Sequence, residues 1–69
     1  MVRFEDAIST TFERILEEPF TFPVVHRDVR RALVRTFPYG VFFRVQGDEV
    51  AVVAVMHLRR HGRAWQGRR

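Results

Sequence analysis

Two prolines, Pro19 and Pro23, divide the chain into a part with a helical hydrophobic period and a part with the period of β-strands. Proline cannot continue a helix, and it restricts the residue before it to extended conformations. The intervening segment Pro-Phe-Thr-Phe-Pro is therefore extended or turning. We expect its residues Phe20 and Phe22 to fill the gap between a helix and a sheet.

The part before Pro19 has the spacing of an amphipathic helix. Its apolar residues recur three and four positions apart, which places them on one helical face. They are Phe4, Ala7, Ile8, Phe12, Ile15 and Leu16. Acidic Glu5 and Asp6 near the start suit the helix dipole. The pattern predicts a helix over residues 4–18.

The part after Pro23 contains three β-like runs, at about residues 29–37, 41–46 and 49–57. Gly47-Asp48 between the last two runs is typical of a tight hairpin turn. Residues 50–57 are apolar on both faces, so we expect this strand to be central and covered on both sides. The sequence predicts one α+β domain over residues 1–69: a helix, a three-stranded antiparallel meander, and a basic tail at 58–69.

A chain of 69 residues has a marginal core, and this one has no cysteine to cross-link it. A single helix also cannot cover both faces of a sheet. We therefore expect a macromolecular partner to supply stability, because a ligand of the folded state stabilises it.

Several classes of protein are disfavoured by the sequence. There is no apolar run of about 18 residues and no leader-like start, so we expect a cytoplasmic protein without a membrane partner. His57 and His61 have a zinc-like spacing, but two Arg residues between them would repel a dication. No nucleotide-binding loop or nucleophile–base set is present. We expect no metal and no cofactor.

The basic residues carry most of the functional signal. All twelve are Arg, and the formal net charge is +4. Anion binding and the codon bias of a GC-rich genome both explain the exclusive use of Arg. Arg59, Arg60 and Arg63 follow the last strand, where fixed cations suit phosphate or an acidic partner.

Four further residues are candidates for the same surface. Arg31 and Arg35 share one face of the predicted strand 29–37, where they either extend the cationic surface or pair with acids of the helix. Tyr39 and His57 either contact phosphate and move protons or are ordinary strand-end residues.

The order of these motifs resembles the RelE/ParE toxin superfamily, and most closely its ParE-like, plasmid-stabilisation branch. The resemblance is carried by an Arg-rich strand leading into Phe37-Pro38-Tyr39, a Gly47-Asp48 hairpin, and His57-Leu58-Arg59-Arg60 with Trp65 downstream. The helix ending in Glu17-Glu18-Pro19 is similar to the family's second helix. The family's first strand and first helix are not represented in the 69 residues.

The resemblance implies the toxin of a type II toxin–antitoxin system, neutralised by a cognate antitoxin. ParE-like members poison DNA gyrase by binding, whereas RelE-like members cut mRNA on the ribosome with Lys and Arg aided by Tyr or His. The absence of Lys favours the gyrase-directed branch, with Arg59, Arg60, Arg63, Tyr39 and His57 on the target-binding surface.

Two alternatives remain at this point. One is a ribosome-dependent endoribonuclease, in which His57 or Tyr39 moves protons. The other is a truncated, non-toxic relic that exposes Phe4, Ile8 and Phe12 and associates through them, with an antitoxin or as a homodimer.

Overall fold

The apolar stripe near the N-terminus forms helix α1, Phe4–Glu17, one residue shorter than expected. The chain is described by a computed structural model that covers residues 2–59. The helix has no side-chain cap; exposed Arg3 instead pairs with Glu5 in the first turn, with Nε and Oε1 3.2 Å apart. The last turn closes when the Glu18 N–H donates to the Arg14 carbonyl, and Pro19 follows.

The proline-framed segment turns the chain from the helix to the sheet. Residues Pro19–Thr21 form a short 3₁₀ helix, η1, and Phe22 returns to an extended conformation. Phe22 fills the gap as expected, because its ring packs edge-on against Phe43, 5.8 Å between centroids. The expectation for Phe20 was wrong: its side chain is exposed.

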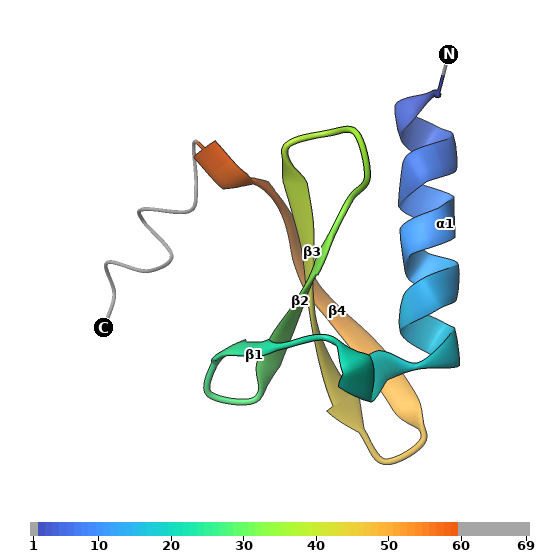
Figure 1. Cartoon of the computed structure of the whole chain (residues 1–69). Coiled ribbons are helices and arrows are strands. Elements are labelled where there is room, and N and C mark those ends of the chain that lie inside the picture. Colours follow the sequence, from blue (N-terminus) through green and yellow to red (C-terminus); the bar gives the residue numbers. More distant parts are fainter. Residues whose placement is uncertain (1, 60–69) are drawn as a thin grey trace.

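The remaining chain forms one antiparallel sheet in the order β1-β2-β3-β4, with α1 against one face (Figure 1). The strands are β1 (Val24–His26), β2 (Val29–Leu33), β3 (Tyr39–Gln46) and β4 (Glu49–His57). The α+β class and the antiparallel meander are therefore confirmed. No helix in the described part of the chain is long and apolar enough to cross a membrane.

The prediction of three strands was wrong, because β1 adds a fourth. Its three residues pair with β2 through a turn at Arg27 and Asp28, with a register shift between Val24 and His26. Arg27 has a φ of 54°, a conformation that Gly, Asn or Asp usually supplies. The turn therefore carries no sequence signal of a hairpin.

The first predicted strand, 29–37, is also shorter than expected. It ends at Leu33, and the chain turns through Thr36, whose φ is 76°. The Val34 N–H still donates to the Tyr39 carbonyl at 2.9 Å, so the turn stays tied to β3. Arg35 consequently lies outside the strand.

The strand at 49–57 is an edge strand, so the expectation that it is central and covered on both sides was wrong. Two successive hairpins place β3 between β2 and β4, and among residues 2–59 β4 pairs with β3 alone. The central strand β3 also has apolar residues on both faces, and its Val41, Phe42 and Phe43 are buried. In β4 the same pattern leaves Val52, Val53 and Val55 exposed.

The core lies between α1 and the helix-facing side of β2 and β3. Ile15 and Phe43 are among its largest fully buried side chains. Thr11 is buried in the same stripe of α1, where its hydroxyl donates to the Ala7 carbonyl at 2.8 Å. The other buried members of this cluster are Ala7, Ala32, Val34 and Val41.

On the opposite face of the sheet, Leu58 lies close to Gly40. A Cβ placed on Gly40 would stand 3.0 Å from the Leu58 side chain and 3.4 Å from Arg31 Cγ. The first distance would require the Leu58 side chain to shift by a few tenths of an ångström, whereas the second is close to an ordinary contact. Gly40 thus allows the chain after β4 to lie against the sheet.

The core predicts a sharp difference between two neighbouring residues of α1. Ile15 is 1% exposed and Leu16 is 68% exposed. We expect Ile15→Ala to lower the free energy of unfolding by about 2–5 kcal/mol. Leu16→Ala should change it by less than about 0.5 kcal/mol. Urea unfolding at low protein concentration measures both, and equal losses would contradict the packing described here.

Candidate functional site

Tyr39 and His57 meet at the end of the sheet where β3 begins and β4 ends. They are cross-strand partners, and their rings pack edge-to-face at 5.1 Å. Both side chains are half-buried. Two residues that can donate and accept protons thus lie side by side on paired strands.

The N-terminal end of α1 packs against Tyr39 of this pair. The Phe4 ring lies 5.0 Å from Tyr39 and 5.1 Å from Phe37. Phe4, expected on an association surface, is 37% exposed and also packs against a candidate target-binding residue. Its spacing in the helix could not reveal this contact, because Phe37 and Tyr39 come from a loop and a distant strand.

Arg59 follows directly from this end of the sheet. The Leu58 N–H donates to the Pro38 carbonyl at 2.8 Å, which ties the chain after β4 to the loop before β3. Arg59 is exposed one residue later. The structure thus brings Arg59, His57 and Tyr39 to the same end of the sheet. Arg60 and Arg63, predicted for the same surface, lie outside the described residues.

Arg31 lies on the other face of the sheet from Tyr39. Its cross-strand partner is Phe42, whereas Tyr39 shares the helix-facing side with Val41 and Phe43. The Arg31 Nε is buried and has no hydrogen-bond partner within residues 2–59. Arg31 therefore does not join Tyr39 on one face.

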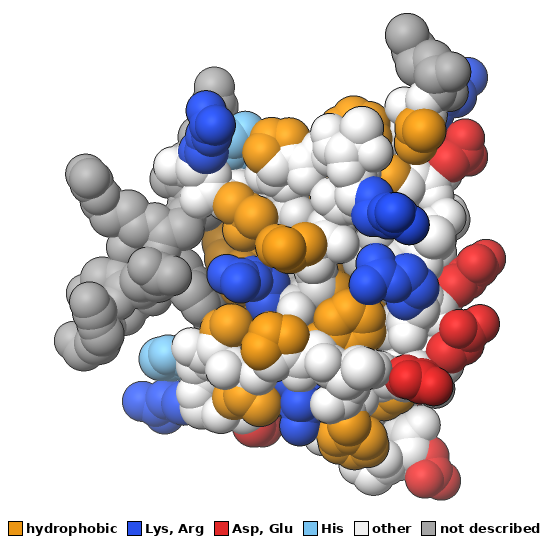
Figure 2. Space-filling model, viewed as in Figure 1, with side chains coloured by type: hydrophobic (Ala, Val, Ile, Leu, Met, Phe, Trp, Pro, Cys, Tyr) orange, Lys and Arg blue, Asp and Glu red, His pale blue; other side chains and the backbone are white. Residues whose placement is uncertain are grey.

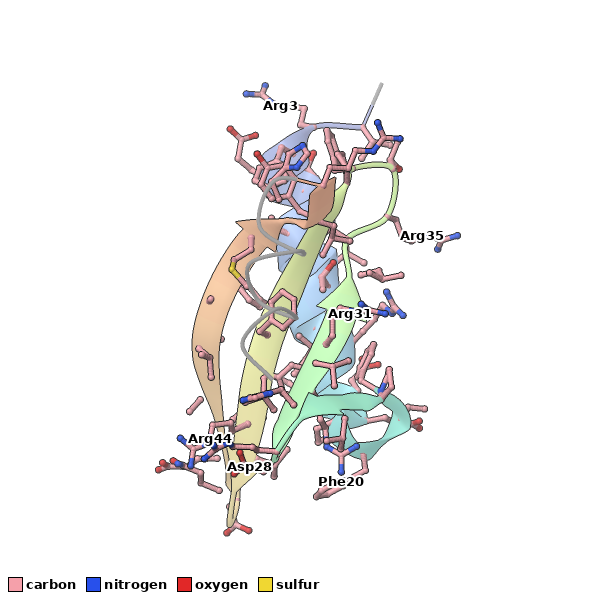
Figure 3. The ribbon with its side chains drawn as sticks, turned by 90° about the vertical axis from the view of Figure 1, so that its left-hand side faces the viewer. Arg3, Phe20, Asp28, Arg31, Arg35 and Arg44 are labelled. Atoms are coloured by element: carbon pink, nitrogen blue, oxygen red, sulfur yellow. The ribbon has the colours of Figure 1, made fainter. Side chains whose placement is uncertain are left out.

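Arg35 is separated from Arg31 as well. It lies in the loop beyond the end of β2, where Figure 3 shows it pointing away from the sheet. With Thr36 it lines a shallow pocket whose other wall is the first half of α1, including Asp6 and Thr10. The expected shared face of Arg31 and Arg35 was wrong, because the strand ends between them.

Another arginine, Arg30, has a structural role that the sequence did not reveal. Its Nη1 donates to the Phe22 carbonyl at 2.7 Å, and its guanidinium stacks 5.1 Å from the Phe20 ring. These contacts hold the turn at η1 against β2. The sequence did contain one indication of this role. Arg30 and Arg31 are consecutive in a strand, so one of them must lie on the helix-facing side of the sheet.

Charge is unevenly distributed over the molecule. Figure 2 shows acidic side chains along the edge where α1 lies and Arg side chains across the rest of that face. The exposed acids of the helix and its end are Glu5, Asp6, Glu13, Glu17 and Glu18. Arg44 is neutralised by Asp28, with Nε and Oδ2 3.2 Å apart near the far end of the sheet (Figure 3).

The chemistry available in the described residues is that of binding and proton transfer. Within residues 2–59 no three His, Cys, Asp or Glu side chains gather in a way that could hold a metal ion. A cation beside a Tyr–His pair can bind an anionic group, and the pair can exchange a proton with it.

The residues expected on an association surface are only partly accessible. Ile8 and Phe12 are half-buried against the core. Phe12 also lines an apolar groove between α1 and β4, together with Ile15, Leu16, Val50 and Val52. The more exposed apolar residues of this region are Leu16 and Val52.

The family of the chain follows from comparison with known proteins. Residues 1–64 match the family model of the ParE toxin of type II toxin-antitoxin system, parDE. The chain belongs to the ParE toxin family. No curated protein and no solved structure matched the chain. The family of ParE toxins implies an antitoxin partner, and it confirms the resemblance carried by the Arg-rich strand, the hairpin and the His-Leu-Arg-Arg segment.

The contacts of Arg30 predict that it contributes to stability in this ParE-family chain. Arg30→Ala should lower the free energy of unfolding by about 1–3 kcal/mol, because it removes a charge-assisted hydrogen bond and a cation–π contact. Arg35→Ala, in the exposed loop, should change it by less than about 0.5 kcal/mol. Urea unfolding compares the two variants, and equal effects would show that Arg30 does not hold η1.

Proposed function

We propose that this ParE-family chain inhibits DNA gyrase by binding it, and that a cognate antitoxin neutralises the inhibition. The observation that supports the surface is the grouping of Arg59, His57 and Tyr39 at one end of the sheet. The proposed surface continues into Arg60 and Arg63. The cytoplasm, where gyrase acts, is the proposed location.

The arginine chemistry supports binding rather than catalysis as the main activity. All twelve basic side chains are Arg, whose planar fork suits carboxylates and phosphates. Without Lys, a Lys-based nuclease centre cannot be assembled. Arg59 is exposed next to an ordered strand, so its guanidinium can reach a partner while its backbone stays fixed by the Leu58–Pro38 hydrogen bond.

A supercoiling assay with purified gyrase, relaxed plasmid and ATP tests this proposal. The wild-type chain should inhibit supercoiling, and the double variant Arg59→Ala, Arg60→Ala should need about tenfold more protein for the same inhibition. A few interface residues, often Arg, supply most of the binding energy, and each of these costs about 1 kcal/mol or more when truncated.

A matched control removes the same charge elsewhere. Arg27 and Arg44 are both away from the proposed surface, Arg27 exposed in the β1–β2 turn and Arg44 in an exposed ion pair with Asp28, and such pairs contribute little to stability. The variant Arg27→Ala, Arg44→Ala should inhibit like the wild type. An equal loss of gyrase inhibition in both double variants would assign the effect to net charge and contradict the proposed surface.

Induction of the chain in a bacterium carrying a DNA-damage reporter tests the target in cells. Arrest with reporter activation, relieved by the antitoxin, supports gyrase poisoning. Arrest without reporter activation argues for the ribosome. Normal growth with folded protein present contradicts toxicity and favours the non-toxic relic.

The contact between Tyr39 and His57 favours a second candidate, a ribosome-dependent mRNA endoribonuclease. In that reaction one side chain would take a proton from the attacking ribose hydroxyl and the other would protonate the leaving oxygen, while Arg59 stabilises the phosphate.

This second candidate makes its own prediction for Tyr39. Tyr39→Phe keeps the ring contacts with Phe4 and His57 and removes only the hydroxyl. If the chain cuts mRNA in a translation extract, this variant should cut at least about 100-fold more slowly, the usual contribution of a general acid or base. Gyrase inhibition should change much less. Unchanged cleavage by Tyr39→Phe would exclude the hydroxyl from the reaction.

A further inference from the structure

Within residues 2–59, strand β4 is a sheet edge with which no further strand pairs. It is the longest strand, with 9 residues, and every residue from Val50 to Met56 is apolar. Natural edge strands are usually short or carry charges or proline, because their free backbone groups would otherwise pair with another strand. The opposite edge follows this rule: β1 has 3 residues and ends in the Arg27-Asp28 turn. Figure 3 shows β4 along the open side of the sheet.

The side chains of this edge are accessible as well. Val52, Val53 and Val55 are 49%, 46% and 41% exposed. On the helix side the strand borders the apolar groove that contains Phe12 and Leu16. Exposed apolar side chains gathered on one element are typical of interaction sites.

The charges near the two ends of β4 indicate which strand can pair with it and in which direction. Asp48 and Glu49 lie at its start, and Arg59 follows its end. Antiparallel pairing with a second β4 brings the acidic end of one copy to the basic end of the other. Parallel pairing would place like charges together, which is unfavourable across strands. The edge is thus complementary to itself.

The faces of the strand define the register of such a pairing. Val50, Val52, Val55 and His57 share the helix-facing side, because their partners in β3 are Val45, Phe43, Val41 and Tyr39. The change in alternation after Val52 reflects a bulge at Val53. A two-fold axis normal to the sheet keeps both helices on one side. Val52 opposite Val55 of the second copy is a register that keeps these faces together.

We propose that two copies of this chain associate through antiparallel β4–β4 pairing and form one continuous sheet with both helices on the same side. This interface centres on β4, whereas the association surface considered from the sequence centres on Phe4, Ile8 and Phe12; the two adjoin at the groove that contains Phe12. It also does not depend on the target of the toxin.

Sedimentation velocity over a range of protein concentrations tests the interface with a matched pair of variants. Val53 in β4 and Val24 in β1 are the same residue type with 46% and 48% exposure on opposite edges. The wild type should dimerise, and Val53→Lys should raise the dissociation constant of the dimer by about tenfold or more, because it buries charge at the interface. Val24→Lys should dimerise like the wild type.

Circular dichroism confirms that the lysine variants remain folded, so that loss of the dimer is not loss of the fold. A wild type that stays monomeric at high micromolar concentration overturns the proposal. A dimer unaffected by Val53→Lys also overturns it, and so does equal weakening by Val24→Lys. A monomer whose edge pairs only with a different protein would assign the surface to that protein and overturn self-pairing.

Disulfide cross-linking tests the register, since the chain has no cysteine of its own. Opposed residues on paired strands have Cβ atoms close enough for a disulfide bond. A mixture of the Val52→Cys and Val55→Cys chains should form mixed dimers on mild oxidation. The mixture of Val24→Cys with Val55→Cys should not. Equal cross-linking in both mixtures overturns the proposed arrangement.

Discussion

The packing of one helical stripe on the central strand holds this domain together. Ala7, Thr11 and Ile15 of α1 are buried on the same side of the sheet as Val41 and Phe43. No second helix within residues 2–59 adds to this layer. The helix extends over β2 and β3, so apolar residues of β4 on the same side remain accessible. The area of sheet that one helix covers therefore determines both the extent of the core and which strand stays exposed.

The sequence allowed the helix, its end at Pro19 and two of the strands to be predicted, because each rests on a local pattern. The strand β1 could not be predicted, since its turn uses Arg27 in a conformation that this residue type seldom adopts. The position of β4 in the sheet was also beyond local reasoning. An apolar strand has the same pattern whether its second neighbour is a strand or solvent, so exposure depends on the whole topology.

The candidate site shows the same division between local and global information. His57 and Tyr39 were expected near each other, since a meander brings the start of one strand to the end of the next. Arg31 and Arg35 were expected together, and the early end of β2 separates them. Arg30 was counted only as a cation, yet it binds the Phe22 carbonyl. The early end of β2 decided the case of Arg31 and Arg35, and a contact with the η1 turn decided that of Arg30. Residue type alone predicts neither.

Gly40 affects the segment that follows the sheet. The absence of a side chain there leaves room for Leu58, and Leu58 immediately precedes Arg59. A methyl group added at position 40 would stand 3.0 Å from the Leu58 side chain, so Leu58 would have to shift by a few tenths of an ångström. Every charge in the chain would stay unchanged. The room above one glycine is thus a constraint on the residue next to Arg59 that no count of charges reveals.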